Sequence, residues 1–286
     1  MVIESLLYPT KAERRPWKMF FVGILYNTIA VFLALWIFNK QASFAAVFFT
    51  VLAAVPLIYN TLKFEEAKDL KTDSEKTLLH EHNRAIWILS AFFLGVVVSS
   101  VAWYVFLPQE TVNSAFAEQI KTISQINNQV SSNVTGFAAS PDLLFRIFFN
   151  NLKVTIFTVL FAFIYCVGSV FIFTWNATVI AVAIGNSIRG GLAEAATSAG
   201  LAKAAEYFGA FSYGFLRYAI HGIPEILAYF YAGIAGGIIS VAVIRNHFSG
   251  SHASTILLDA SELLLISLGF LVVGAVFEVY VTPAIF

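Results

Sequence analysis

The sequence has few charged residues and a single cysteine. Only 12% of its 286 residues are Asp, Glu, Lys or Arg, whereas soluble domains usually carry about a quarter. So few charges would not cover a water-exposed surface, which argues against a soluble globular protein. The net charge is zero, so the basic surface that nucleic-acid binding requires is missing. Cys166 lies alone in an apolar run, which excludes a disulfide within the chain and a cysteine-based metal cluster.

Sequence signatures of catalysis are also missing. The chain has no HExxH, no GxSxG and no glycine-rich phosphate loop. His221 and Glu225 are spaced like half of a metal site, but a metal needs three or four ligands, and the other histidines fall in predicted loops. We therefore expect no enzyme, no bound metal and no cofactor.

Long apolar runs dominate what the sequence does contain. Hydrophobic residues make up 59% of the chain, and its mean hydropathy is +0.79. A helix crosses the hydrocarbon core of a bilayer with about 20 apolar residues. The runs predict an all-α fold, a polytopic transmembrane helical bundle with about six or seven spans in the cell membrane. The predicted apolar segments are 17–38, 44–62, 85–107, 143–174, 211–244 and 262–281.

Basic residues predict how the first part of the chain is oriented. Four lie before or at the beginning of the first span and five lie in the charged loop 63–84, whereas the segments on the other side hold Lys40 and Lys121. Loops rich in Lys and Arg stay in the cytoplasm. We therefore expect a cytoplasmic N-terminus and an N-terminal three-helix membrane segment, 1–107, whose loop 63–84 is cytoplasmic.

The segment 108–142 has the pattern of an extracytoplasmic amphipathic helix. Its apolar residues recur every three or four positions: Phe116, Ile120, Ile123, Ile126, Val130 and Val134. The other face is mostly Gln, Asn and Ser. Asn133 opens an Asn-Val-Thr sequence, the acceptor pattern for glycosylation, on the side where that modification occurs.

The second half, 143–286, is less regular. Trp175 and Asn176 interrupt an apolar stretch, and the run that follows, 177–188, is short for a span. Gly222 and Pro224 lie inside another apolar stretch, and because proline lacks a backbone donor they predict a broken or sharply kinked helix there. The segment 176–210 is either re-entrant, giving six crossings, or spans the membrane, giving seven.

Polar residues inside a membrane span cost free energy, so each of them is expected to have a stabilising partner or a functional role. Arg217, His221 and Glu225 are four residues apart and share one face of a helix. Such a stripe can bind an anion, carry protons or hold neighbouring helices together, and we favour the structural interpretation. Glu278 lies near the end of the last span, and we expect it to extend to the membrane interface rather than join a site.

Three short pieces carry a family resemblance. They are Phe145-Arg-Ile-Phe-Phe-Asn150-Asn151-Leu152, then Trp175-Asn176-Ala177, then His221-Gly-Ile-Pro-Glu225-Ile226. In this order and spacing they resemble the stage II sporulation protein M family of integral membrane proteins, over residues 143–286. Ala177 departs from the glycine that the family tends to have. The founding member is a membrane scaffold for cell-wall hydrolases during engulfment, so the resemblance implies a scaffold.

Two functional hypotheses follow. The leading one is a non-enzymatic scaffold that organises membrane or envelope proteins through the loop 63–84 and the outer amphipathic helix. The alternative is a transporter or channel whose midplane site is formed by Asn150, Asn176, His221 and Glu225, since interrupted helices commonly build such sites. The lipid bilayer is the other expected partner, nucleic acid is not one, and self-association is left open.

Overall fold

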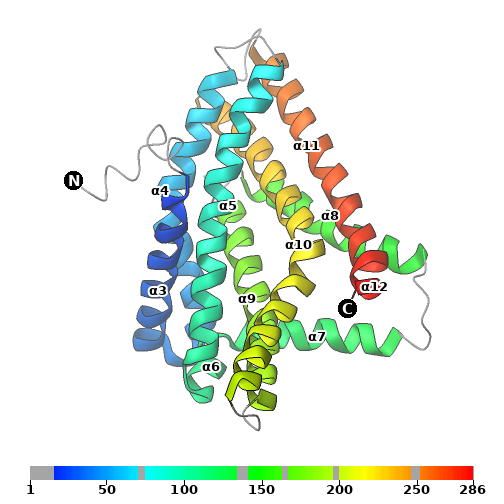
Figure 1. Cartoon of the computed structure of the whole chain (residues 1–286). Coiled ribbons are helices and arrows are strands. Elements are labelled where there is room, and N and C mark those ends of the chain that lie inside the picture. The colour runs from blue at the N-terminus through cyan, green and yellow to red at the C-terminus, as the bar shows by residue number, and fades with distance from the viewer. Residues whose placement is uncertain are drawn as a thin grey trace.

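The computed structural model describes residues 16–69, 75–133, 141–162, 167–195, 200–245 and 252–285, and these ranges are helical, without strands (Figure 1). The helices are α3 (Lys18–Phe38), α4 (Ala42–Asp69), α5 (Glu75–Phe106), α6 (Gln109–Ala115), α7 (Ala117–Asn133), α8 (Pro141–Ala162), α9 (Val167–Ala195), α10 (Gly200–Ile244), α11 (His252–Val276) and α12 (Thr282–Ile285). A π-helical turn, Phe277–Val281, joins the last two. The predicted all-α fold is confirmed.

Six helical runs among the described residues are long and apolar enough to cross a membrane. The first, Lys18–Phe64, contains both α3 and α4. A 3₁₀ turn, Asn39–Gln41, separates them, and Asn39 has a φ of 32°. Asparagine tolerates positive φ better than most residues, so the chain reverses there and α3 and α4 lie side by side (Figure 1). Counted separately, they raise the number of candidate spans to seven.

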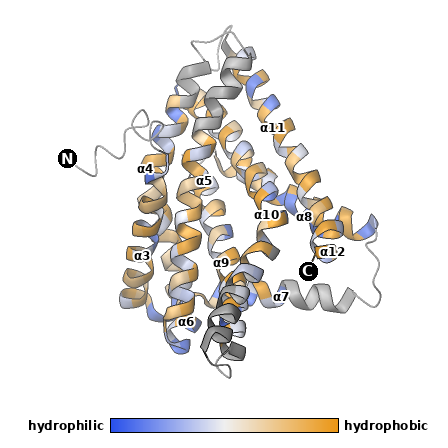
Figure 2. Ribbon diagram, viewed as in Figure 1, coloured by the Kyte–Doolittle hydropathy of each residue, from blue (hydrophilic) through white to orange (hydrophobic). Residues whose placement is uncertain are grey.

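Helix α10 occupies the centre of the bundle, in contact with α4, α8, α9 and α11. In the most apolar stretch of α10, 72% of the residues are buried, compared with 17% in that of α8 and 28% in that of α11. The outer helices therefore expose large apolar side chains, among them Phe149 and Phe157 of α8 and Leu258 and Leu265 of α11. Apolar residues follow the spans along their length (Figure 2). A buried central helix surrounded by apolar outward faces is what a bilayer requires.

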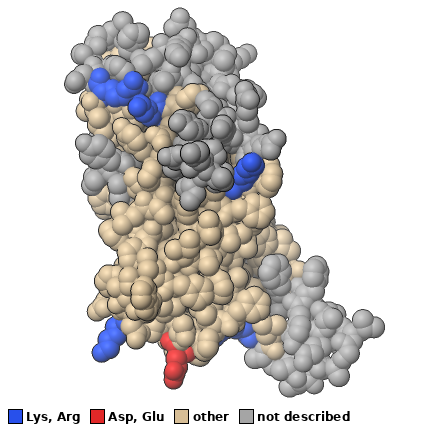
Figure 3. Space-filling model, turned by 90° about the vertical axis from the view of Figure 1, so that its left-hand side faces the viewer, with Lys and Arg blue, Asp and Glu red and all other residues tan. Residues whose placement is uncertain are grey.

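Charged side chains lie toward the ends of the molecule on the face shown in Figure 3. The described Lys, Arg, Asp and Glu residues are found there above and below a belt that carries none. Such a belt matches the hydrocarbon core, where charges are costly. Composition, helix length and charge placement thus agree on a multi-pass membrane protein.

The predicted break at Gly222 and Pro224 is wrong. Both residues lie inside α10, which continues from Gly200 to Ile244 with Pro224 in its interior. Figure 1 shows that α10 bends along its length instead of breaking. A proline removes one backbone hydrogen bond and is a common cause of such bends, but neighbouring helices can accommodate the freed carbonyl in a membrane protein.

The predicted helix 143–174 and the re-entrant alternative for 176–210 are also wrong. Helix α8 ends at Ala162 and α9 runs from Val167 to Ala195, so Asn176 lies within a helix and not at its end. The run Gly168–Leu192 is long enough to cross the membrane. Asn176 does not interrupt α9 because its side-chain amide donates to the carbonyl of Ile172 in the same helix, 2.8 Å away.

The segments between spans are more helical than the sequence suggested. The loop 63–84 is replaced, in its described residues, by the end of α4 and the beginning of α5. The outer amphipathic segment forms two helices, α6 and α7, with Phe116 between them. Figure 1 shows α7 lying crosswise to the spans at the end of the bundle opposite the α4–α5 connection.

Candidate functional site

Polar residues from α8, α10 and the α11–α12 segment meet in what we call the Glu225 cluster: Asn151, His221, Glu225, Tyr229, Glu278 and Thr282. Helix α10 supplies three of them at a spacing of four residues, which places them on one face. The sequence predicted the first two of these, and the structure adds Tyr229 one turn further along. The cluster therefore begins as a polar stripe on the most buried span.

Asn151 connects α8 to this stripe with both ends of its side-chain amide. Its Nδ2 donates to Oε1 of Glu225 at 2.5 Å, and its Oδ1 accepts from the Tyr229 hydroxyl at 3.2 Å. Asn151 is 8% exposed and Tyr229 is 5% exposed. A buried amide that both donates and accepts satisfies its main hydrogen-bonding needs, so these contacts fix α8 against α10.

Glu278 reaches the cluster from the π-helical turn Phe277–Val281. Its carboxyl group lies close to that of Glu225. Gly274, one turn earlier, makes room for this approach, because a Cβ there would lie 2.8 Å from Cγ of Glu225. The expectation that Glu278 extends to the membrane interface is therefore wrong. Its side chain is half-buried and turned toward α10.

His221 lies one turn before Glu225 and contacts the end of the chain. Its Nδ1 is 3.2 Å from the Thr282 hydroxyl, which belongs to a residue only 8% exposed. Its ring also meets Tyr218 edge-on, with the ring centroids 6.4 Å apart. Together, Glu225 and His221 connect α10 to the α11–α12 segment at two successive turns.

The remaining predicted residues take other positions. Asn150 is exposed on α8, and Asn176 bonds to its own helix. Gly222 and Pro224 flank the stripe within α10. The side chains of Arg217 and Asn133 lie outside the described part of the structure, although both residues belong to helices.

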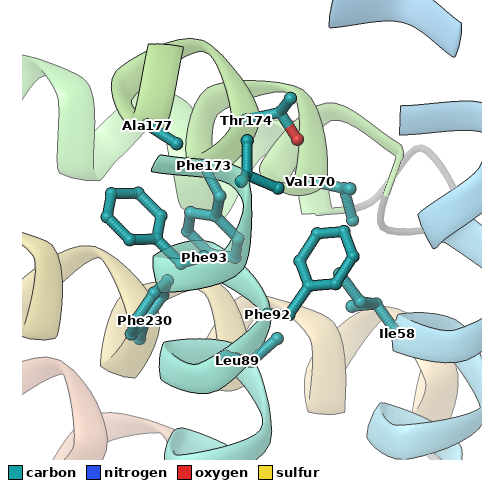
Figure 4. A pocket seen from close by; sticks show the side chains of 10 residues that line it. Ile58, Leu89, Phe92, Phe93, Val170, Phe173, Thr174, Ala177 and Phe230 are labelled. Carbon is teal, nitrogen blue, oxygen red and sulfur yellow. The ribbon is translucent and has the colours of Figure 1, made fainter. Parts of the chain in front are cut away.

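A metal site is not formed by the part of the chain that the structure describes. There, no three His, Cys, Asp or Glu side chains converge as ligands. A cavity of about 10 Å³ lies elsewhere, between α4, α5, α9 and α10. Figure 4 shows its lining, which is apolar apart from Thr174, whose hydroxyl has no hydrogen-bond partner. This cavity is separate from the Glu225 cluster in both residues and chemistry.

A second set of polar contacts seats α7 on the bundle. Gln119 of α7 is 1% exposed. It accepts from the Ser43 hydroxyl at 2.6 Å and donates to the Thr178 hydroxyl at 3.2 Å. These contacts join α7 to α4 and α9. Nearby, the guanidinium of Arg189 donates to the carbonyl of Leu107 at 2.5 Å, just beyond the end of α5.

Sequence reasoning missed Glu278, Tyr229 and Thr282 as partners of the stripe. One signal was available for Glu278, because an acid inside an apolar run needs a named partner. A glycine four residues before it, Gly274, marks the same face of the helix as a site of close approach. Tyr229 continues the spacing of four from His221, but a tyrosine on a buried helix has many ordinary explanations.

Comparison with known proteins identifies the family. No curated protein and no solved structure matches the chain. The family model described as stage II sporulation protein M matches residues 85–283, more than half of the chain. The match extends further toward the N-terminus than the resemblance noted above, and it includes α5, the α6–α7 segment and the whole Glu225 cluster. The chain therefore belongs to the stage II sporulation protein M family.

Proposed function

We propose that the protein is a non-enzymatic membrane scaffold that organises partner proteins. The carrying observation is that the polar groups of the Glu225 cluster are engaged with one another across three elements. Hydrogen bonds between spanning helices contribute about 0.6 kcal/mol each on average, and a set of them holds helices in one arrangement. A fixed bundle of this kind suits a protein whose role is to hold others in place.

The seated α7 helix is the proposed docking surface. Its first half is tied to α4 and α9 through Gln119, while its far end extends beyond the bundle (Figure 1). Lys121, Ser124 and Gln125 are exposed on the part nearest the bundle. A helix that is anchored at one end and exposed on one face can present the same surface to a partner repeatedly.

The proposed orientation places the N-terminus in the cytoplasm. Basic residues are concentrated before the first span and in 63–84, which supports this assignment. Helix α7 then lies outside the cytoplasm, where envelope proteins are accessible. The extended ends of α4 and α5 lie on the cytoplasmic side and form a second candidate surface.

A transporter or channel is the second candidate. It is favoured by Pro224 inside α10 and by the π-helical turn that holds Glu278, since irregular helices often line membrane sites. It needs a water-accessible cavity lined by Asn150, Asn176, His221 and Glu225. The structure pairs Glu225 with Asn151, exposes Asn150 and bonds Asn176 to its own helix. We therefore rank transport below scaffolding.

Site-specific photo-crosslinking in native membranes tests the scaffold. A photoreactive residue at Gln125 of α7 should give a reproducible adduct with one or a few proteins. The matched control is Leu265 of α11, which is 68% exposed on an apolar face and should give lipid adducts only. Protein adducts at both positions in equal yield, or at neither, would contradict docking on α7. Flux of a solute that depends on Glu225 would support the transporter instead.

A further inference from the structure

Helix α8 carries polar residues on two opposite faces. The face packed into the bundle holds Asn151 and Thr155, which are buried. The opposite face holds Arg146, Asn150 and Lys153, which are all exposed. Their spacings of four and three residues place these three side chains on one side of a helix, and we call them the α8 stripe. The paired asparagines of the family motif are thus divided, one toward the Glu225 cluster and one toward the surroundings of the bundle.

The two cations of the α8 stripe have no partner in the part of the chain that the structure describes. Neither Arg146 nor Lys153 makes a hydrogen bond or an ion pair there. Helix α8 is nevertheless one of the candidate spans, Pro141–Ala162. A basic side chain on the lipid-facing side of a span costs free energy unless it reaches water or an anion. The α8 stripe therefore lacks a negatively charged partner.

The position of the stripe along α8 favours the headgroup region of the bilayer as the source of that partner. Lys153 lies 12 residues after Pro141, about 18 Å along a helix axis. Figure 1 shows α8 inclined to α3 and α5, so the depth of Lys153 below the interface is smaller than that length. Side chains of a helix also lean toward its N-terminus, and long basic side chains extend toward the interface. Both cations are thereby directed to the interface at which α8 begins.

We propose that the α8 stripe binds the headgroup of one anionic phospholipid. Arg146 and Lys153 are seven residues apart, about 10 Å along the axis, and their flexible stems allow both cations to approach one phosphate group from two sides. The guanidinium offers a fork of donors and the ammonium a compact charge. The amide of Asn150 lies between them and is a further donor. The proposal goes beyond the scaffold and does not depend on it, because it concerns the lipid around the bundle.

Exposed aromatic rings border the stripe and provide surface for the acyl chains. Phe145 and Phe149 stack with their ring centroids 6.5 Å apart, and Phe157 and Phe161 stack at 5.7 Å. All four rings are exposed on α8. A charged stripe with apolar rings beside it matches a molecule that has an anionic head and apolar tails.

A second copy of the chain is a poorer occupant of this face. Two α8 helices packed around a twofold axis would bring the same residues together, and Lys153 would then lie near its own copy. Asp142, the acid at the beginning of α8, is exposed and forms no ion pair with Arg146 among the described residues. The face therefore keeps a net positive charge, which favours an anionic lipid over a like-charged copy.

Native mass spectrometry of the purified full-length protein tests the site. The protein in neutral detergent is titrated with phosphatidylglycerol and, separately, with zwitterionic phosphatidylcholine. We expect one phosphatidylglycerol to bind more tightly than any phosphatidylcholine, and excess inorganic phosphate should not displace it. Equal binding of the two lipids, or displacement by inorganic phosphate, would overturn the proposal.

Substitutions in the stripe locate the bound lipid. Each of Arg146→Gln and Lys153→Gln should weaken the binding of phosphatidylglycerol about fivefold, since a basic residue near an anionic lipid surface contributes roughly that factor. Lys153→Arg keeps the charge and should bind like the wild type. The matched control is Lys121→Gln, which removes an exposed cation from α7 and should change nothing. Should one Gln variant fail to fold, the other decides. Unchanged binding in a folded variant would overturn the proposal.

A photoreactive residue at position 150 identifies the occupant in native membranes. We expect adducts enriched in anionic phospholipid compared with adducts formed at Leu258 of α11, which is 69% exposed. A protein adduct at position 150, with this chain or another, would overturn the proposal in favour of a protein interface. Either result leaves crosslinking from α7 as a separate test of the scaffold.

Discussion

Among the polar joints between spanning helices in the described part of the chain, two use different chemistry. The α3–α5 joint is neutral. Asn27 donates to the hydroxyls of Ser99 and Ser100, at 3.0 Å each. Thr28 lies 3.0 Å from Ser99 and accepts from the indole of Trp103 at 3.1 Å. The Glu225 cluster instead brings two acidic side chains close together. Amides and hydroxyls are neutral donors and acceptors, whereas a carboxyl group can carry a charge.

Close approach of the backbones also differs between the two joints. At the α3–α5 crossing, a Cβ on Gly23 would lie 2.3 Å from the carbonyl oxygen of Phe92, and one on Gly95 would lie 2.1 Å from that of Phe20. The corresponding glycine of the acidic joint, Gly274, faces a side chain rather than a backbone. Backbone contact makes the neutral joint rigid, whereas the acidic joint rests on groups that can rotate away.

The two joints also differ in their position relative to the family match. It begins at residue 85, so α3 lies outside it, while the Glu225 cluster lies within it. The difference teaches that one membrane bundle can combine a joint built on backbone contact with one built on side chains. The backbone joint attaches the N-terminal helix α3, and the side-chain joint lies in the matched region.

Gly95→Ala should have the largest effect, because it disrupts the backbone contact of the α3–α5 joint. The new methyl group would overlap the Phe20 carbonyl, and overpacking of this kind costs roughly 1 to 3 kcal/mol. We expect a lower free energy of unfolding in mixed detergent micelles, at every pH. Gly269→Ala is the control, since a Cβ there meets nothing within 4 Å and alanine favours a helix by about 0.5 kcal/mol or more. Equal destabilisation by both variants would mean that the backbones are not in contact.

Asn27→Ala should have a smaller effect that does not change with pH. It removes two hydrogen bonds between α3 and α5, and at about 0.6 kcal/mol for each bond in a membrane protein the loss is about 1 kcal/mol. The measurement is the melting temperature of wild type and variant at several pH values. A loss that grows or shrinks with pH would mean that the α3–α5 joint is not made by neutral groups alone.

Much of the fold follows from the sequence because the bilayer restricts the choices. Apolar run lengths located the spans of α3, α4 and α5, and the spacing of Ile and Val predicted helix in the outer segment. The predictions about single residues that interrupt the apolar runs were wrong. Asn176 looked like an interruption, but its amide is satisfied inside α9. Gly222 and Pro224 looked like a break, but helices packed around α10 tolerate them.

The site was only partly visible because it depends on contacts between distant residues. The sequence could place His221 and Glu225 on one face, since helical spacing is local. It could not show that Asn151 would face them while its neighbour Asn150 would be exposed. That choice depends on how α8 is rotated against α10. Glu278 illustrates the same limit, because its partner lies on another helix.

Asn176→Ala should have the smallest effect, and it sharpens where the acidic joint ends. The Asn176 amide donates to Ile172 of its own helix, so losing it breaks no contact between helices. Side-chain bonds of this local kind contribute little to helix stability, and we expect the free energy of unfolding to change by less than about 0.5 kcal/mol.

Asn151→Ala is the matched comparison, because it breaks bonds to both Glu225 and Tyr229 and should lower the free energy of unfolding by about 1 kcal/mol or more. The melting temperatures of the two variants, measured under the same conditions, test this difference. Equal losses would mean that Asn176 supports the same joint as Asn151, as the transporter hypothesis would require, and the boundary drawn around the Glu225 cluster would have to include α9.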